Sequence, residues 1–331
     1  MNGDLGFIGI SRENPEAVPS IGAGPSKTAE TTTLVRSGES MKPADIRLFF
    51  DPYAIRFIKP ALLAWFNAHP DETREIVEYE ERRFPGMNSA IVARTRYFDD
   101  IISESLETGV EQLVIMGAGF DARAHRISGL SSGVRVFELD QPDTQAVKQL
   151  RVREIFGHLP SHVSYVPADL KTAVWQETLI DHGYDPGKKS LFVLEGLCMY
   201  LSPETVDTIL GFVVSRAGPG SSVLFDYPAM SLIDGSDDSL IAKNFRQRVN
   251  GLGEPLRFGI PDGSVVAFLH RRGFSRVRNL TPPEGNARYF HGKNADRPMC
   301  SLFSFVHADI PMKGKNCKYG GELPVCRKGL L

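Results

Sequence analysis

Five short apolar segments, separated by stretches long enough to hold a helix, constrain the fold of this chain more than any other feature. Each contains four to six residues, and unbroken apolar runs of this length are typical of parallel strands buried on both faces. The predicted strands are 112–116, 134–139, 163–166, 191–194 and 222–225. Strands that alternate with helices predict right-handed βαβ units, and therefore an α/β fold with a doubly wound, mostly parallel sheet.

Helical segments connect these strands and follow the last of them. The predicted crossover helices are 121–127, 142–156, 173–182 and 203–216. After the fifth strand, a polar helical stretch at 237–249 predicts part of a lid around residues 227–262. A helix at 264–271 and a final strand at 299–307 complete the predicted α/β domain, which spans residues 109–311.

The remaining parts of the chain lack this alternation of predicted strands and helices. Residues 1–30 mix Gly, Pro, Ser and Asn without apolar periodicity, which predicts a flexible arm. Residues 31–108 predict a helical cap, with helices at 71–83 and 88–107. Residues 312–331 predict a C-terminal tail.

Composition excludes some classes of protein. The formal net charge of −2 argues against a nucleic-acid-binding protein, which is normally basic. We expect no membrane association, because no apolar run approaches the length of a span and the N-terminus lacks the pattern of a secretory signal. Four cysteines in 331 residues do not make a disulfide framework, and Cys317 and Cys326 fit no common zinc spacing. We therefore expect free thiols, no metal and a cytoplasmic location, while the oligomeric state stays open.

A carboxylate follows each of the first four predicted strands. Because the carboxyl ends of parallel strands meet at one edge of the sheet, where ligands bind in such folds, we expect these side chains to line one cleft. The four residues are Asp121, Asp140, Asp169 and Glu195.

A glycine loop after the first strand identifies a nucleoside cofactor but leaves two classes open. Gly117, Gly119 and Ala122 fit the pattern G-x-G-x-x-G/A, which serves both NAD(P) and S-adenosylmethionine. A pyrophosphate at this helix N-terminus would be repelled by Asp121, whereas the sulfonium and ammonium groups of S-adenosylmethionine favour acidic surroundings. Asp121 can also simply cap the helix. We predict S-adenosylmethionine as the cofactor, with an NAD(P)-dependent oxidoreductase as the alternative.

Position suggests a role for each side chain. The two glycines let the loop pass close to the methionine part of the cofactor, and Asp140 accepts hydrogen bonds from both ribose hydroxyls. Asp169, with the backbone amide of Leu170, receives the adenine amine, and Glu195 faces the methionine ammonium. The cofactor carboxylate needs a cation, for which Arg94 and Arg96 are the nearest in sequence.

No His, Asp or Glu in the sequence identifies itself as a general base. A carboxylate acceptor is already ionised at neutral pH and needs none, whereas a hydroxyl acceptor does. The acceptor is therefore a carboxylate or a hydroxyl, and a carboxylate or an acidic phenol is favoured. Tyr200 and Tyr227, which follow the fourth and fifth strands, are candidates for hydrogen bonding to it.

Several of these motifs, in order, resemble the leucine carboxyl methyltransferase family, and most closely its bacterial small-molecule branch. The segments that carry the resemblance are SKTAE (26–30), DPYAIRFI (51–58), ARTRYFDD (93–100), MGAGFDARAHRI (116–127), VFELDQP (136–142), ADL (168–170) and LEGLCMYLSPETV (194–206). The resemblance implies an S-adenosylmethionine-dependent O-methyltransferase with a class I fold and a helical cap. Its acceptor would be a small molecule, including a polyketide-like one, or a protein C-terminus.

The resemblance also implies particular contacts to the cofactor. These are Arg94, Gly117, Asp140, Asp169, Leu170 and Glu195. It further implies a basic residue in the N-terminal segment, for which Lys27 and Arg36 are the candidates. The C-terminal third matches weakly, so the identity of the acceptor does not follow from the resemblance.

Overall fold

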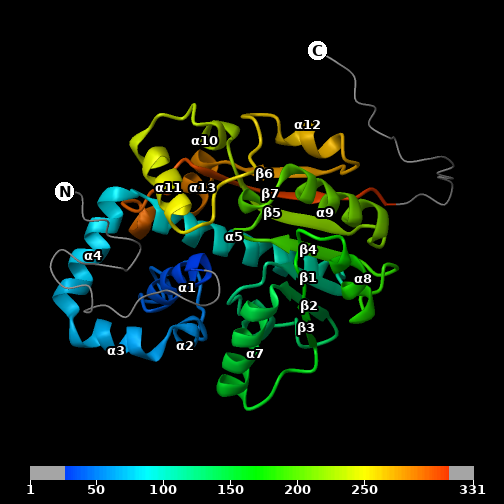
Figure 1. The fold of residues 1–331 in the computed structure, drawn as a ribbon, viewed down its shortest axis with the longest axis horizontal. Coiled ribbons are helices and arrows are strands. Elements are labelled where there is room, and N and C mark those ends of the chain that lie inside the picture. The colour runs from blue at the N-terminus through cyan, green and yellow to red at the C-terminus, as the bar shows by residue number, and fades with distance from the viewer. Residues whose placement is uncertain (1–26, 313–331) are drawn as a thin grey trace.

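A seven-stranded sheet forms the centre of the computed structural model, which describes residues 27–312 (Figure 1). The strand order is β3-β2-β1-β4-β5-β7-β6. The strands are β1 (Gln112–Met116), β2 (Arg135–Asp140), β3 (Val163–Pro167), β4 (Ser190–Leu194), β5 (Ser222–Pro228), β6 (Val277–Leu280) and β7 (Phe303–Asp309). β1 to β5 are parallel, and β7 pairs antiparallel with both β5 and β6. The predicted doubly wound, mostly parallel sheet is confirmed, and its order reverses between β1 and β4.

The C-terminal edge of the sheet differs from the sequence prediction. Strand β6 was not predicted, because an edge strand that reads Val-Arg-Asn-Leu is only half-buried and has no apolar run. The final strand begins at Phe303 rather than at residue 299. The backbone of Met299 bonds instead to the Asn286 side chain, and that of Cys300 bonds to Gly86, so neither residue is free to extend β7.

Five helices precede the sheet. They are α1 (Lys27–Ser40), α2 (Ala54–Phe57), α3 (Pro60–Ala68), α4 (Pro70–Arg83) and α5 (Met87–Glu107). Helix α1 begins four residues inside the segment predicted as a flexible arm. The rest of that segment, the tail from residue 313 with Cys317 and Cys326, and the side chain of Lys27 lie outside the described residues.

Helices cover both faces of the sheet. The remaining helical segments are α6 (Arg123–Arg126), α7 (Pro142–Phe156), α8 (Val174–Asp181), η1 (Cys198–Tyr200), α9 (Pro203–Arg216), α10 (Met230–Asp234), α11 (Leu240–Gly251), α12 (Val265–His270), α13 (Pro282–Tyr289) and η2 (Gly292–Asn294). Helix α5 packs Phe98 and Ile101 on one face, while α8 and α9 pack Trp175 and Ile209 on the other (Figure 1). In residues 27–312, no helix combines the length and apolarity needed to cross a bilayer.

Candidate active site

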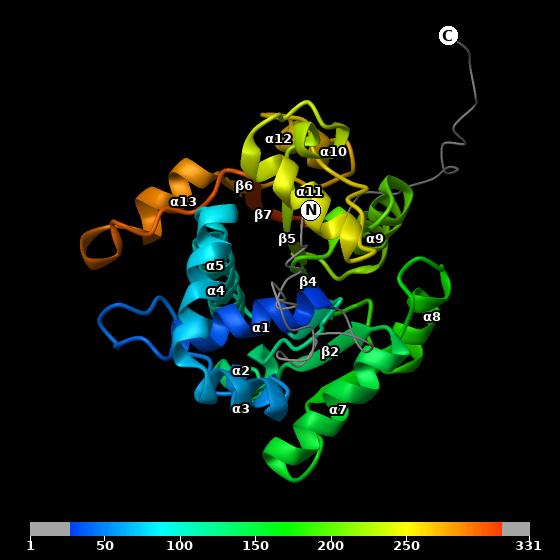
Figure 2. The ribbon, with the colours of Figure 1, turned by 60° about the vertical axis from the view of Figure 1, so that its left-hand side comes forward.

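A cleft of about 550 Å³ opens at the carboxyl ends of β1, β2 and β4. Helices α1 and α11 border it, and both lie over the strand ends in Figure 2. Most of the residues singled out from the sequence line this cleft, although they are far apart in the chain. They are Arg36, Arg94, Gly117, Gly119, Asp121, Asp140, Glu195 and Tyr200.

The glycine loop after β1 is shaped by protein neighbours as well as by the cleft. Gly117 and Gly119 adopt φ values of +65° and +45°, a region that favours glycine. A Cβ on Gly117 would lie 2.9 Å from Leu197 Cδ1, and one on Gly119 would lie 3.2 Å from Ala29 Cβ. The sequence suggested only that a side chain at these glycines would block a ligand. The structure shows that it would also displace Leu197 or Ala29, which line the cleft.

Asp140 is the last residue of β2, and its side chain binds the backbone of the glycine loop. Its Oδ2 accepts a hydrogen bond from the Gly119 amide at 2.6 Å, and its Oδ1 accepts one from the Gln141 amide at 2.7 Å. Burial raises the pKa of this carboxyl, and the two backbone hydrogen bonds oppose the rise. Each oxygen retains acceptor capacity, so the side chain can still take a pair of hydroxyls from the cleft.

Glu195, at the exit of β4, lies between two arginines. Its Oε1 accepts from Arg94 Nε at 3.0 Å, and its Oε2 accepts from Arg123 Nη1 at 2.5 Å. Arg94 also donates through Nη1 to Asp226 Oδ2 at 2.9 Å. Burial lowers the pKa of Arg94, but the charges of Asp226 and Glu195 outweigh burial and raise it. Arg94 Nη2 makes no hydrogen bond to residues 27–312 and is the donor left for an anion in the cleft.

Of the two arginines that the sequence left open, Arg94 lines the cleft and Arg96 does not. Arg96 points away from the cleft, where its Nε binds Asp100 Oδ1 at 2.7 Å and its side chain is 43% exposed. Asp226, in contrast, contacts Arg94 and was missed. It follows the predicted fifth strand as the other carboxylates follow the first four, so the same rule of strand ends could have found it.

Arg123 is the second residue that the sequence analysis missed. Its side chain is 1% exposed, and besides Glu195 it binds Asp121 Oδ2 through Nη1 at 2.6 Å and Asp99 Oδ1 through Nε at 2.7 Å. Burial disfavours the charged form of Asp121, but the charges of Arg123 and Lys148 outweigh burial and lower its pKa. Arginines therefore compensate the charges of Asp121 and Glu195, which the sequence analysis did not anticipate. Asp121 also accepts from the Arg123 amide, as the helix-capping alternative suggested.

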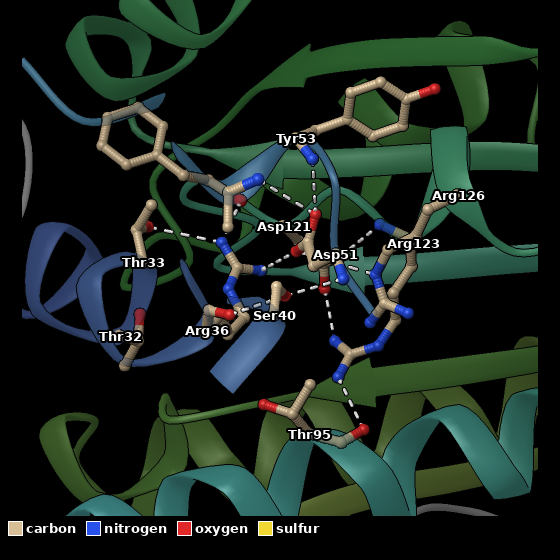
Figure 3. A network of polar contacts seen from close by, with 12 residues as sticks. Thr32, Thr33, Arg36, Ser40, Asp51, Tyr53, Thr95, Asp121, Arg123 and Arg126 are labelled. Atoms are coloured by element: carbon tan, nitrogen blue, oxygen red, sulfur yellow. Dashed lines mark hydrogen bonds and ion pairs between the residues drawn. The ribbon is translucent and has the colours of Figure 1, made fainter. Parts of the chain in front are cut away.

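The buried ion pairs continue from the glycine loop into the N-terminal helices (Figure 3). Arg126 binds Asp99 at 2.8 Å and lies 3.7 Å from Asp51, which in turn lies 3.7 Å from Arg36. Arg36 Nη2 then donates to the backbone oxygen of Phe120 at 2.6 Å. Helix α1 is thereby joined to the loop that it covers. Arg36 lines the cleft, and within the described chain its buried Nε has no hydrogen-bond partner.

Asp169 and Leu170 stand apart from the other predicted contacts. Asp169 Oδ1 accepts from the Lys171 amide at 3.0 Å, and Leu170 is buried in the core on the α8 side of the sheet. Of this segment, only Lys171 lines the cleft. Their contact with adenine stays a prediction.

The two candidate tyrosines have different surroundings. Tyr200 lines the cleft, and burial together with the Glu254 charge raises its pKa, so its hydroxyl stays protonated. Tyr227 is not among the lining residues; it is 7% exposed and donates to Asn279 Oδ1 at 3.0 Å. Strand β5 runs to Pro228 rather than ending at Phe225, and its alternation turns Tyr227 into the core while Asp226 reaches Arg94.

One part of the cleft lining is apolar. We call it the apolar half, and the part lined by Arg36, Arg94, Asp121, Asp140 and Glu195 the polar half. The apolar half comprises Phe84, Met87, Ile91, Phe245, Val249, Leu252, Phe303 and Phe305. No histidine of residues 27–312 lines the cleft, and in the same range no three His, Cys, Asp or Glu side chains gather as metal ligands.

Fold and cleft together define a class I methyltransferase. The chain belongs to the leucine carboxyl methyltransferase family, whose model matches residues 29–214. This confirms the resemblance found in the sequence motifs and decides against the oxidoreductase alternative.

Individual relatives agree with this membership. A candidate S-adenosyl-L-methionine-dependent methyltransferase of Mycolicibacterium vanbaalenii is 32% identical over 280 residues, which cover 78% of this chain and 90% of that protein. A similarly named protein of a Parafrankia species is 35% identical over 206 residues, covering 62% and 63% of the two chains. Among solved structures, a candidate methyltransferase of Thermobifida fusca shares the fold, with a TM-score of 0.56 and 14% identity over 91% of this chain and all of that one.

Proposed function

We propose that this enzyme methylates the carboxylate of a small, largely apolar acid. That the methyl donor is S-adenosylmethionine follows from the family; the acceptor and the roles of individual residues are the proposal. One observation supports the carboxylate most directly: among the described residues no histidine lines the cleft, and the acids of the polar half are held by arginines or backbone amides. A cytoplasmic location, expected from the cysteine content, belongs to the same proposal.

The polar half fits the cofactor as the sequence suggested. Asp140 would accept from the ribose hydroxyls, and Glu195 from the methionine ammonium. Arg94, through the unpaired Nη2, would bind the methionine carboxylate, and the buried Nε of Arg36 makes that residue a better candidate than Arg96 for a second cation. Asp169 and Leu170 would hold the adenine amine at the margin of the cleft.

Four acid or hydroxyl side chains of the cleft are poorly suited to act as a base, whereas Asp143, which also lines the cleft, is an exposed acid on α7. Asp121 and Glu195 are paired with buried arginines, Glu254 accepts a hydrogen bond from Thr28, and Tyr200 stays protonated. A hydroxyl acceptor would keep its proton here and be a poor nucleophile.

A carboxylate acceptor needs no such base, because it is ionised at neutral pH. One of its oxygens bonds to the methyl carbon while the carbon–sulfur bond breaks, and no proton has to move. The bound cofactor supplies the activated methyl on a sulfonium that leaves as a neutral thioether. The protein then has to orient the acceptor oxygen and exclude water, and the apolar half provides both.

Product chemistry tests the proposal. The enzyme is incubated with methyl-labelled S-adenosylmethionine and with matched pairs of short-chain and aromatic acids and alcohols. We expect label in methyl esters, which release methanol in mild alkali, and none in ethers. Labelled ethers that survive alkali, or labelling only of peptides with a free C-terminus, would contradict it.

A further inference from the structure

We propose that Arg257 is the residue that selects an anionic acceptor, by pairing with the carboxylate of the acid that enters the apolar half. This inference rests on the proposed function and assigns a chemical class to the acceptor: an acid with one carboxylate on a hydrocarbon or aromatic body.

Besides Arg36 and Arg94, two arginines line the cleft, and they differ in how their charge is compensated. Arg248, on α11, has its guanidinium 2.6 Å from Glu80 Oε2 and 3.7 Å from the centre of the Phe84 ring. Its charge is thus met by the chain itself. Arg248 is part of the wall between α4 and α11.

Arg257 is held by its backbone and has no such partner. The Arg257 amide donates to the Met199 backbone oxygen at 2.7 Å, which places Arg257 beside η1. Met199 lies four residues after Glu195, which stands at the exit of β4. The Arg257 side chain is exposed and lines the cleft, and no carboxylate of residues 27–312 lies within 4.0 Å of it. The acid nearest in sequence, Glu254, accepts a hydrogen bond from Thr28.

The charge of Arg257 is therefore unmatched by the chain at the border of an apolar surface. A guanidinium pairs with a carboxylate through two parallel hydrogen bonds, and the attraction increases where nearby apolar groups exclude water. Neutral and cationic molecules gain nothing from this contact. Because Arg257 adjoins the exit of β4, a carboxylate bound there is close to the polar half where the methyl donor is proposed to bind.

A small acid fits this cleft better than a protein C-terminus. The volume of about 550 Å³ has to hold the cofactor as well as the acceptor. The Thr28–Glu254 hydrogen bond joins α1 to the loop before Arg257, and both residues line the cleft. A peptide chain would have to pass this contact, whereas a small molecule needs no continuous groove.

Calorimetry on the enzyme saturated with S-adenosylhomocysteine tests the inference. Octanoate and its methyl ester serve as probes, because they share one apolar body and differ in charge. We expect Arg257→Gln to raise the Kd of octanoate about tenfold and to change that of the ester less than twofold. Arg257→Lys should recover part of the loss. The matched control is Arg271→Gln, which removes an exposed arginine outside the cleft and should leave both Kd values unchanged.

The results separate failure of this inference from failure of the proposed function. Equal Kd values for octanoate in the wild type and Arg257→Gln would overturn the role of Arg257, as would preference of the wild type for octan-1-ol. Ester formation on a peptide C-terminus but not on octanoate would overturn the small acid. The Kd of S-adenosylmethionine is measured separately: a wild type that does not bind it contradicts the proposed function itself, and the inference with it.

Discussion

The two halves of the cleft are held in shape by different forces. In the polar half, ion pairs fix the side chains: Arg94, Glu195, Arg123 and Asp121 form one connected series with distances of 2.5–3.0 Å. In the apolar half, packing does so, as between Phe245 and Phe303, whose ring centres lie 5.4 Å apart. The segment that matches the family model ends at residue 214, before α11 and β7. Most of the apolar half lies beyond that segment, although Phe84, Met87 and Ile91 lie within it. We therefore expect the polar half to carry the shared cofactor chemistry, and the later residues of the apolar half the specificity of this chain.

The largest effect should come from removing the cation at the centre of the polar half. Arg123→Ala leaves Asp121, Asp99 and Glu195 without their common partner in a buried environment. We expect a loss of about 3–5 kcal/mol in the free energy of unfolding, measured by urea denaturation, and loss of S-adenosylmethionine binding. Arg151→Ala, at a partly exposed pair with Glu154, is the control and should cost less than about 1 kcal/mol. A similarly small loss for Arg123→Ala would mean that the ion pairs do not hold this half together.

Asp140→Ala should give the next largest effect, and mainly on the cofactor. Loss of the hydrogen bonds to ribose should weaken S-adenosylmethionine binding by about 1.5–3 kcal/mol, or roughly ten- to a hundredfold in Kd by calorimetry. Asp143→Ala, an exposed acid lining the same cleft, should change the Kd less than threefold. If both variants bind equally well, the ribose contact lies elsewhere.

The sequence was most informative where a pattern is local. Strands β1 to β5 begin within one residue of the predicted positions, because each is a short segment dominated by apolar residues. The carboxylates at the strand ends could be found for the same reason. Their compensation by Arg123 could not, because that contact depends on the fold bringing α6 beside β4.

Tyr227 shows a second limit of sequence patterns. A strand predicted to stop at Phe225 leaves Tyr227 in a loop that could reach the cleft. The observed strand continues to Pro228, and its pairing with β7 fixes the alternation of side chains. The strand thus ends three residues later than predicted. As a result, Tyr227 packs in the core, and Asp226 is the residue of this strand that contacts Arg94.

Acidification should destabilise the fold through His125, which lies on α6 two residues after Arg123. Burial, together with the Lys148 charge, lowers the pKa of His125 from 6.5 to about 4, so the folded protein holds the ring neutral. A depressed histidine pKa stabilises the fold above pH 6.5, and that contribution is lost as the pH falls from 6.5 towards 4. We expect His125→Phe to reduce the fall in unfolding free energy between pH 7 and 4 by about 1–2 kcal/mol. His270→Gln, at an exposed histidine, is the control; equal pH profiles for all three proteins would contradict the assignment.

The smallest expected effect concerns Phe245 in the apolar half. Phe245 is half-buried on α11, lines the apolar half and packs against Phe303, but it makes no contact with the ion pairs of the polar half. Phe245→Ala should therefore raise KM for octanoate by about threefold, or under 1 kcal/mol, by loss of apolar contact with the acceptor. The Kd of S-adenosylmethionine should stay within twofold, and Phe245→Leu should restore most of the loss. The opposite result would be a lower affinity for S-adenosylmethionine with an unchanged KM for octanoate. Phe245, which packing alone holds, would then be part of the cofactor site, and the two halves would not bind separate ligands.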